Sequence, residues 1–375
     1  MISKNRWLIQ VVSQLKPARC GVSDQAVLLA QELEAAFGIK SAFVILNSDE
    51  TCDVPYPMIH CAPAKLLGAC ASLSGGQPAA LLVHLSGYGY ATDGAPTHLA
   101  AALEKVREDG RFRIAVYFHE LFASSMPWKS AFWHSRRQKK TIRRITATGD
   151  LLVTSIRRHA DLLKSEIVQR SDISVTLLPV FSAVGETLAP APAAQRQPSL
   201  IVFGLAGSRQ RAYKELSSLQ ESLSGLGAEE ILDIGPDFDV PNSLNGIPVR
   251  RLGQMAAADL AERFSGSMFG FLSYRSWLLA KSSIFASYCA QGTIPVIAES
   301  FDSEADGLKD GVHVLSPKTV LAAKASGFQD CSIAAWRWYT GHSLRVHVAT
   351  YAQWLDGDST RAGEETPILA KLEGQ

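Results

Sequence analysis

One continuous stretch, residues 268–298, constrains the fold of this chain more than any other. Met268–Ser273 (MFGFLS) is an apolar run of strand length, and Ile294–Ala298 (IPVIA) is a second such run. Between them apolar residues recur at helical spacing, Ser282 or Ser283 suits the N-cap of a helix, and Gly292 falls where a left-handed C-terminal cap belongs. The order strand, loop, helix, strand is that of the right-handed parallel crossover unit. The stretch therefore predicts an α/β fold built on a parallel sheet.

The loop Tyr274–Lys281 connects the first of these strands to the helix, so we expect it at the carboxyl end of a parallel strand. A helix N-terminus aimed at such a loop binds anions, because its free backbone N–H groups and its dipole both favour a phosphate. Lys281 adds a full positive charge, and Ser282 and Ser283 add hydroxyl groups. These three residues are our candidates for holding a diphosphate, with a lysine that only solvates the loop as the alternative.

The first half of the chain alternates strand and helix patterns. The runs of strand length are Trp7–Ser13, Ser41–Leu46, Ala79–Leu85, Arg113–Phe118 and Leu151–Ser155. Such alternation is typical of a mostly parallel sheet with helices on both faces. The loops that follow the strands should share one ligand-binding edge, and they include Lys16–Ser23, Ser86–Pro96 and His119–Trp128.

A change of composition near Leu188 divides the chain. The segment LAPAPAAQRQP has no core-forming pattern and three prolines, which is the composition of a linker. The alternation then starts afresh, and 375 residues are long for one domain. We therefore predict a first Rossmann-like domain (1–187), a linker (188–198), a second Rossmann-like domain (199–340), and a C-terminal helix and tail (341–375). The cleft between the two ligand-binding edges is the expected active site.

Composition argues against several classes of protein. A net charge of +1 argues against a protein that coats nucleic acid over its whole surface, and no apolar run approaches the length of a membrane span. The N-terminal segment lacks a small-residue cleavage site, so the cytoplasm is the expected compartment.

The six cysteines form no CxxC pair. Cys52, Cys61 and Cys70 recur at regular intervals with His60 beside the second, which invites interpretation as a metal site. Structural zinc sites, however, usually bring their ligands in close pairs. We therefore expect buried reduced thiols and no metal site.

Several segments resemble the glycosyltransferases of the GT-B fold, in particular the retaining family 4 type. PARCGVSDQAVLLAQEL resembles the glycine turn and helix that open such enzymes, and LIVFGLAGSRQRAYKEL resembles the opening of their second domain. VRRLGQMAAADLAERFSGSMFGFLSY and CAQGTIPVIAESFDSEADGLKDGVHVL resemble the segments around the donor site. The resemblance covers nearly the whole chain. It implies two doubly wound Rossmann-like domains, with the helical pattern over 333–355 forming a terminal helix that crosses back to the first.

The same resemblance implies a function. The expected protein is a metal-independent transferase that moves a sugar, with retention, from a nucleotide-sugar donor to a carbohydrate or lipid-linked acceptor in polysaccharide or glycan assembly. No cofactor is implied, since the nucleotide sugar is a substrate. A GT-B-shaped protein that binds a sugar or nucleotide without transfer is the alternative. An adaptor for membranes or nucleic acids, built on a basic helix, is a third hypothesis.

The resemblance also assigns residues to the donor phosphates. Arg209 and Arg211 match the basic loop of the second domain, where a fork-shaped guanidinium suits a diphosphate. Gly204 would let phosphate approach the backbone, and Gly21 matches the first-domain turn that passes close to the phosphates. The alternative for both arginines is an ordinary solvated helix start.

Residues of the first domain are candidates for contact with the sugar. His119 matches a histidine that lies near the transferred sugar in relatives, and with Glu120 beside it forms our catalytic pair. We predict that the histidine hydrogen-bonds the sugar or acceptor, with a satisfied structural histidine as the alternative. Tyr88 and Tyr90, in a glycine-rich loop, are candidates for contacting a sugar or for packing the loop. Asp24 is expected to cap a helix.

One departure from the family concerns the donor site. Its members usually carry two glutamates before the glycine that matches Gly292, the first on sugar hydroxyls and the second on the ribose. Leu279 and Ser287 occupy those positions here. Neither can do the work of a carboxylate, so the donor contacts must differ or the activity is lost.

The segment 128–145 (WKSAFWHSRRQKKTIRRI) holds seven Lys or Arg and no acid, with Trp128, Phe132 and Trp133 interleaved. A basic helix with aromatic anchors can lie on an anionic membrane or meet a phosphate-bearing acceptor, so we predict peripheral contact with the inner membrane face. No recognised nucleic-acid module accompanies the segment, and no nucleic-acid partner is predicted. A helix packed by its apolar side with a solvated cationic face is the alternative.

Overall fold

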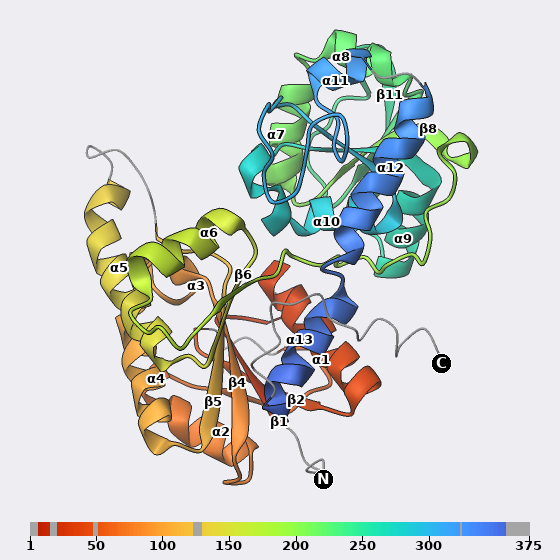
Figure 1. Cartoon of the computed structure of the whole chain (residues 1–375). Helices are drawn as coiled ribbons and strands as arrows, with labels where there is room; N and C mark the ends of the chain where they lie inside the picture. The colour runs from red at the N-terminus through yellow and green to blue at the C-terminus, as the bar shows by residue number, and fades with distance from the viewer. Residues whose placement is uncertain (1–6, 16–20, 48–51, 123–129, 323–324, 358–375) are drawn as a thin grey trace. The chain divides into compact units, whose positions relative to one another are not determined.

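The structure is a computed structural model with two compact units (Figure 1). It describes residues 7–15, 21–47, 52–122, 130–322 and 325–357. The first unit contains the described residues up to Leu178 together with those from Arg345 onward, and the second runs from Pro179 to Leu344. The first unit thus ends before the predicted boundary at residue 187.

The first unit is built on a seven-stranded sheet with the order β3-β2-β1-β4-β5-β6-β7, in which every neighbouring pair is parallel. Its strands are β1 (Trp7–Val12), β2 (Lys40–Ile45), β3 (Met58–His60), β4 (Ala79–Leu85), β5 (Phe112–Phe118), β6 (Leu151–Thr154) and β7 (Val175–Leu177). Its helices are α1 (Gly21–Phe37), α2 (Leu66–Leu73), α3 (Gly87–Tyr90), α4 (Thr97–Asp109), α5 (Ser130–Thr148), α6 (Arg157–Leu162) and α13 (Leu344–Asp356). The strand order reverses between β1 and β4, which is where a doubly wound sheet binds ligands.

Helices cover both faces of this sheet. Figure 1 shows α4 and α5 on one side and α1 and α13 on the other. Because both faces are covered, β1, β4 and β5 are buried almost throughout and appear in the sequence as near-continuous apolar runs. Helix α4 turns Leu99, Leu103 and Val106 toward the core, and it ends at Gly110, whose φ of 77° glycine adopts without strain.

The C-terminal helical pattern is two helices and not the single one predicted over 333–355. Helix α12 (Ala325–Thr340) belongs to the second unit, and α13 belongs, from Arg345 onward, to the first. The carbonyl of Trp354 in α13 accepts a hydrogen bond of 2.5 Å from Arg113 of β5, whose guanidinium also lies over the Trp354 ring. The terminal helix therefore packs on the first unit, as the resemblance implies.

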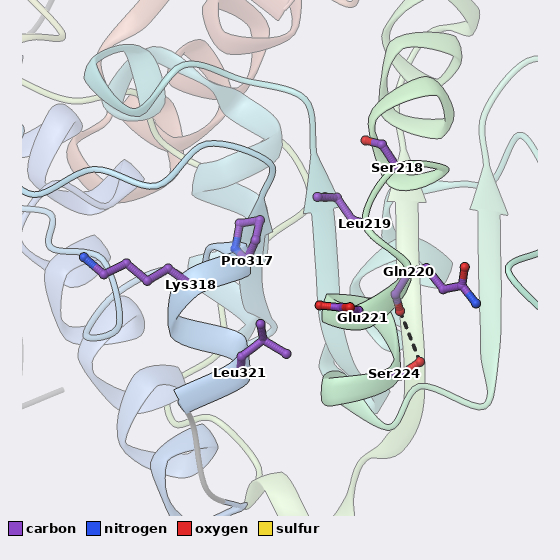
Figure 2. A pocket seen from close by; sticks show the side chains of 8 residues that line it. All are labelled: Ser218, Leu219, Gln220, Glu221, Ser224, Pro317, Lys318 and Leu321. Carbon is purple, nitrogen blue, oxygen red and sulfur yellow. Dashed lines mark hydrogen bonds between the residues drawn. The ribbon is translucent and has the colours of Figure 1, made fainter.

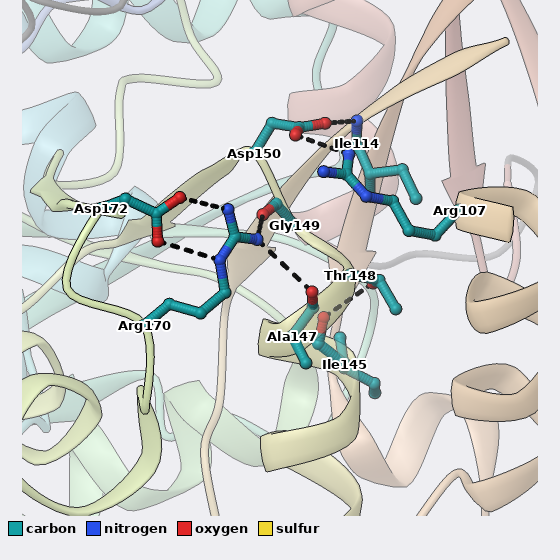
Figure 3. Close-up of polar contacts among 9 residues, drawn as sticks. All are labelled: Arg107, Ile114, Ile145, Ala147, Thr148, Gly149, Asp150, Arg170 and Asp172. Atoms are coloured by element: carbon teal, nitrogen blue, oxygen red, sulfur yellow. Dashed lines mark hydrogen bonds and ion pairs between the residues drawn. The ribbon is translucent and has the colours of Figure 1, made fainter. Parts of the chain in front are cut away.

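A polar network joins the amino ends of β5, β6 and β7 (Figure 3). Asp150 accepts a hydrogen bond of 2.8 Å from the backbone of Ile114 and pairs with Arg107 of α4 at 2.6 Å. Arg170 pairs with Asp172 at 2.7 Å and donates to the backbone that precedes β6. Because these residues lie at the edge opposite to the strand carboxyl ends, the network serves the fold and not a ligand site.

The second unit contains a six-stranded sheet with the order β10-β11-β9-β8-β12-β13, in which only the pair β10–β11 is antiparallel. Its strands are β8 (Gln197–Phe203), β9 (Glu230–Ile234), β10 (Ser243–Leu244), β11 (Ile247–Gly253), β12 (Ser267–Leu272) and β13 (Ile294–Ile297). Its helices are α7 (Ala206–Leu216), α8 (Gln220–Leu226), α9 (Ala257–Gly266), α10 (Ser283–Gln291), α11 (Pro317–Ala322) and α12, and a 3₁₀ turn spans Ser276–Lys281. The order reverses between β8 and β12. The two doubly wound sheets confirm the predicted fold class.

The stretch 268–298 folds as predicted. Strands β12 and β13 are parallel neighbours, and α10 connects them. Ser282 caps α10, because its hydroxyl accepts a hydrogen bond of 3.2 Å from the backbone of Phe285. Gly292 ends the helix in the left-handed conformation, with φ of 69°.

The basic loop that the resemblance assigns to Arg209 and Arg211 is helical, because α7 begins at Ala206. Residues 217–219 separate α7 from α8. Strand β3 is too short to leave a periodic pattern in the sequence.

The segment 188–198 is not a free linker, because it packs on the second unit. Arg196 is only 5% exposed and donates to the carbonyls of Ala191, at 2.8 Å, and Gly292. The backbone N–H of Ala193 donates to Gln329 of α12 at 2.6 Å. The prolines of this segment therefore shape an anchored strap and not a flexible tether.

Candidate functional site

A pocket opens in the second unit at the carboxyl ends of β12 and β13. Its volume is about 540 Å³, and it is lined by Arg211, Glu215, Ser273, Tyr274, Arg275, Leu278, Ala298 and Glu299. We call it the switch-edge pocket, because it lies on the edge where the strand order reverses between β8 and β12.

Three separate segments of the second unit supply this lining. Arg211 and Glu215 come from α7, which follows β8, and their spacing of one helical turn places them on one face. The residues around Arg275 follow β12, and Glu299 follows β13. The carboxyl ends of parallel strands meet at one edge, so residues far apart in the sequence line one pocket.

The charges of the switch-edge pocket suit a ligand that carries both an anion and hydroxyl groups. Arg275 lies 3.5 Å from the Oε1 atom of Glu299, and the Arg275 side chain is 70% exposed. Arg211 is exposed as well. The Oε2 atom of Glu299 has no hydrogen-bond partner within the described residues. The two guanidinium groups can bind an anion, and the carboxylate oxygen can accept from a hydroxyl.

Arg209, which we predicted to bind the donor, is part of the core of the second unit. Its side chain is 1% exposed and forms an ion pair with Asp233 of β9. It also donates to the carbonyls of Gly204, at 3.0 Å, and Pro236, and its guanidinium lies 4.6 Å from the centre of the Phe238 ring. Its donors are therefore directed to protein groups, and the prediction of a diphosphate contact is wrong. Burial raises the pKa of Asp233, and the Arg209 cation opposes that rise.

The other predicted donor residues of the second unit also make contacts within the protein. Gly204 ends β8 with φ of 136°, and Ser282 is 7% exposed and serves as the helix cap. The carbonyl of Ser283 accepts a hydrogen bond of 2.7 Å from Ser287, and Lys281 is half-buried at the end of the 3₁₀ turn. In the described part of the chain, Arg211 alone among the predicted donor residues lines the switch-edge pocket.

The two positions of the missing glutamates face the interior. Leu279 is fully buried, and Ser287 is 1% exposed. The Ser287 hydroxyl donates to Ser283 and accepts a hydrogen bond of 3.3 Å from the backbone of Ala183. A glutamate at either position would place a charge in the core.

A second hollow lies between the turn before α8 and the start of α11 (Figure 2). Its volume is about 950 Å³, and it is lined by Ser218, Leu219, Gln220, Glu221, Ser224, Pro317, Lys318 and Leu321. It contains none of the residues that the sequence predicted for a site. Lys318 pairs with Asp302 at 3.2 Å, with both side chains largely exposed.

In the first unit, three polar side chains meet near the strand reversal between β1 and β4. His119 directly follows β5, and its Nε2 atom lies 3.2 Å from Nδ1 of His84 in β4. The Nε2 atom of His84 lies 2.8 Å from Oε1 of Gln10 in β1. All three side chains are buried, with His119 8% exposed. The ring of Tyr117 packs at 4.3 Å from that of His119.

The burial of His84 predicts a pH dependence of stability. Burial lowers the pKa of His84 from 6.5 to about 3. As the pH falls below 6.5, the unfolded chain therefore takes up a proton that the folded chain does not, and the free energy of unfolding should fall by about 1.4 kcal/mol per pH unit. Urea unfolding between pH 7 and 4 should show a slope that is steeper by about this amount in the wild type than in His84→Gln. Equal slopes in the two proteins would contradict a buried neutral His84.

The remaining predicted residues of the first unit divide into exposed and inward-facing ones. Glu120 is exposed and accepts a hydrogen bond of 3.1 Å from Ser86. Tyr88 is 51% exposed, and its hydroxyl accepts a hydrogen bond of 3.3 Å from Gln138 of α5. Tyr90 instead directs its hydroxyl, at 3.1 Å, to backbone carbonyls of β1 and β4, so it packs its own loop. Gly21 is exposed at the first position of α1.

Helix α5 uses most of its described cations within the first unit. Arg137 pairs with Asp93 at 3.0 Å, Lys139 with Glu166 at 2.6 Å, and Arg144 with Glu104 at 2.7 Å, while Arg143 donates to the Glu166 carbonyl. Arg136 and Lys140 are exposed. Trp128 and the side chains of Phe132 and Trp133 lie outside the described residues. Surface pairs of this kind contribute little stability but reduce the charge available to a membrane.

No group of His, Cys, Asp and Glu side chains within the described ranges is arranged to hold a metal ion. Cys70 is buried and Cys52 and Cys61 are half-buried, and burial raises the pKa of Cys70 to about 12. Over the same ranges, we find no helix with the length and apolar character needed to cross a membrane.

No protein-family model matches this chain, and no curated protein matches its sequence. Solved structures nevertheless match its fold. A trehalose 6-phosphate synthase from Burkholderia multivorans matches with a TM-score of 0.58 and 12% identity, over 96% of this chain and 98% of that one. A sucrose-phosphate synthase from Thermosynechococcus elongatus matches with a TM-score of 0.57 and 11% identity, over 95% of this chain and 100% of that one.

An α-glucosyltransferase solved in complex with UDP matches with a TM-score of 0.55 and 12% identity, over 90% of this chain and 96% of that one. Membership of family 4 remains a prediction. The likeness over nearly the full length, together with the two doubly wound units, shows that this chain has the GT-B glycosyltransferase fold.

Proposed function

We propose that this protein is a glycosyltransferase that takes a sugar from a nucleotide-sugar donor, and that the donor diphosphate binds in the switch-edge pocket. The lining of that pocket by Arg211, Arg275 and Glu299 is the observation that carries the proposal. The pocket lies where doubly wound sheets bind ligands, and about 540 Å³ is within the size range of ligand sites.

The two arginines and the glutamate have different roles in this proposal. Arg211 and Arg275 stabilise the nucleoside diphosphate as charge develops on it, which requires cations in place before the bond breaks. Glu299 accepts from hydroxyl groups of the ribose or the sugar, and so replaces the glutamates that are absent at 279 and 287. One α-glucosyltransferase of the same fold was solved with UDP and another with UDP-glucose, so UDP-glucose is the first donor to test.

Replacing Arg275 by alanine should weaken binding of the cognate nucleoside diphosphate by about 10- to 100-fold, because a hydrogen bond to a charged group contributes about 1.5–3 kcal/mol. Calorimetric titration of the wild type with UDP, GDP, ADP, dTDP and CMP identifies the nucleotide, and the variant is then titrated with that nucleotide.

Lys318→Ala is the matched control for this experiment. Lys318 is an exposed cation of the same unit and, like Arg275, has a carboxylate partner, but it lines the other hollow. We expect it to leave affinity unchanged. Unchanged affinity in Arg275→Ala would contradict the proposed pocket, and an equal loss in both variants would reveal a general effect of charge.

The proposed reaction transfers the sugar with retention, without a metal, to a carbohydrate or lipid-linked acceptor in polysaccharide or glycan assembly. A product with the anomeric configuration of the donor, read by NMR, tests retention. Turnover that persists in EDTA tests independence of a metal. The proposed location is the cytoplasm, with peripheral contact to the inner membrane face through the exposed Arg136 and Lys140 of α5. Sedimentation with anionic and neutral vesicles tests that contact.

A binding protein without transfer activity is the second candidate function. It is favoured by the burial of Leu279 and Ser287 at the positions where relatives carry glutamates. It predicts saturable nucleotide binding in the same pocket and no turnover with any acceptor.

A further inference from the structure

We propose that Gln10 and His84 are positioning residues that fix the tautomer of His119, so that His119 holds a proton permanently on Nε2 and exchanges protons only at Nδ1. We call the three side chains the Gln10 relay. The consequence for catalysis rests on the proposed glycosyltransferase function, whereas the tautomer itself does not.

The relay begins at a group whose role is unambiguous. The carbonyl of Ala26 in α1 can only accept a hydrogen bond, and it lies 3.0 Å from the amide of Gln10. The Gln10 group that faces it must therefore be the NH₂ group. The other end of the same amide, Oε1, is then an acceptor directed toward His84.

That acceptor determines the tautomer of His84. The Nε2 atom of His84 lies 2.8 Å from the Gln10 oxygen, so it must carry a hydrogen. His84 is fully enclosed by protein, and burial lowers its pKa to about 3, so the ring is neutral at ordinary pH. A neutral ring has a single N–H group. The Nδ1 atom of His84 is consequently a lone-pair acceptor.

The same reasoning passes to His119. Its Nε2 atom lies 3.2 Å from Nδ1 of His84, the ring centroids are 5.4 Å apart, and the two ring planes differ by 20°. A nitrogen–nitrogen distance so much shorter than the centroid distance places the rings edge to edge, so an N–H group of one can meet the lone pair of the other. Because His84 supplies the lone pair, His119 must supply the hydrogen. Neutral His119 therefore carries its lone pair on Nδ1.

The surroundings of His119 are consistent with proton exchange at that one nitrogen. Among the described residues, the titratable groups next to it besides His84 are Tyr117 on β5 and Glu120 directly after it, and the ring of His347 on α13 lies 6.3 Å from that of Tyr117. Burial raises the pKa of Tyr117 well above 10, and its hydroxyl donates to the carbonyl of Leu178 at 3.2 Å. Tyr117 therefore stays neutral at ordinary pH.

The relay determines which nitrogen of His119 accepts or donates a hydrogen bond to a ligand. In the neutral form Nδ1 accepts a hydrogen bond from a donor such as a sugar hydroxyl. Protonation adds a donor at Nδ1 while the Nε2–H group keeps its bond to His84, so the ring can change its charge without losing its position. A histidine that is free to change tautomer would lose that orientation. General acid–base catalysis requires a fixed geometry, so the loss would lower its efficiency.

Long-range ¹H–¹⁵N NMR of histidine-labelled full-length protein tests the relay directly, with His119→Asn and His84→Leu used to assign the two spectra. In the wild type without ligand we expect both rings as Nε2–H tautomers at pH 8. On acidification to pH 5, His84 should stay neutral and His119 should keep its Nε2 hydrogen, so that any added proton appears at Nδ1. An Nδ1–H tautomer for His119, or protonation of His84 in this range, would overturn the proposal.

Two variants separate positioning from packing. Tyr117→Phe keeps the ring against His119 and removes only the hydroxyl directed to Leu178, so the His119 tautomer should not change. Gln10→Leu removes the acceptor for His84, so His84 should gain the Nδ1–H form and His119 should lose its preference for Nε2–H. An unchanged His119 spectrum in Gln10→Leu would refute the relay. Because these spectra need no substrate, a failure of nucleotide binding leaves the tautomer result intact and is distinguishable from it.

Discussion

Replacing Arg209 by alanine should lower the free energy of unfolding of the second unit by about 3–5 kcal/mol, because the variant leaves the Asp233 carboxylate buried without its partner. The wild-type pair is almost fully enclosed, with side-chain exposures of 1% for Arg209 and 3% for Asp233. The guanidinium also holds the carbonyls of Gly204 and Pro236, which would lose their donors. Urea unfolding followed by circular dichroism measures the loss.

Arg211→Ala is the matched control, since Arg211 lies on the same helix but is exposed. Its unfolding free energy should stay within about 0.5 kcal/mol of the wild type, as is usual for surface substitutions. The double variant Arg209→Ala/Asp233→Leu removes both charges and should recover part of the stability lost in the single variant. If Arg209→Ala were as stable as the wild type but no longer bound the nucleotide, Arg209 would again be a candidate for binding the nucleotide-sugar donor.

Replacing Gly292 by alanine should destabilise the second unit by about 2–5 kcal/mol, combining left-handed strain with a steric clash. A Cβ at Gly292 would clash with the Cβ of Pro190 and would lie 2.7 Å from the guanidinium of Arg196. Both contacts come from the strap 188–198, so the clash should weaken its attachment as well. Urea unfolding measures the loss, and faster proteolysis within 188–198 would report the loosened strap.

Gly227→Ala separates the two contributions. Gly227 is also a left-handed C-terminal cap, with φ of 64°, but a Cβ there meets no atom within 4 Å. This variant should lose only the strain, about 1–2 kcal/mol. Equal losses of unfolding free energy in the two variants would mean that residues 188–198 move away from the new Cβ without destabilising the unit.

Local chemistry made the fold of the stretch 268–298 predictable from sequence. Ser282 is a cap because its hydroxyl reaches a backbone amide of the next turn, and Gly292 ends the helix because glycine tolerates positive φ. Both effects act within a few residues. The same holds for the strands β4 and β5, whose burial on two faces leaves continuous apolar runs.

Long-range pairing made the site harder to predict. Arg209 lies on the buried face of α7 and has its partner in Asp233 of β9, whereas Arg211 lies on the exposed face. A carboxylate inside the apolar run ILDI was a signal of a buried partner. Glu299 was missed because the sequence does not distinguish it from an ordinary loop acid, although it lies two residues after β13 at the ligand-binding edge.

The polar residues of the Gln10 relay carried a similar signal. Gln10 interrupts WLIQVV, and His84 interrupts AALLVHL, so each places a polar group in a fully buried strand. Their pairing follows from the strand order, in which β1 and β4 are neighbours although β2 and β3 intervene in the sequence. Sequence periodicity contains no information on that order.

The hydroxyl of Ser287 contacts the segment through which the chain enters the second unit. It accepts a hydrogen bond from the backbone N–H of Ala183, and it lies near the hydroxyl of Ser182, at 3.2 Å. The position that the resemblance assigns to a ribose contact is thus used here to hold the chain where it enters the second unit. Restoring a glutamate at 287 would first have to dislodge that entry segment. Under the proposed function, donor specificity should therefore be easier to change at Glu299, just after β13, than at position 287.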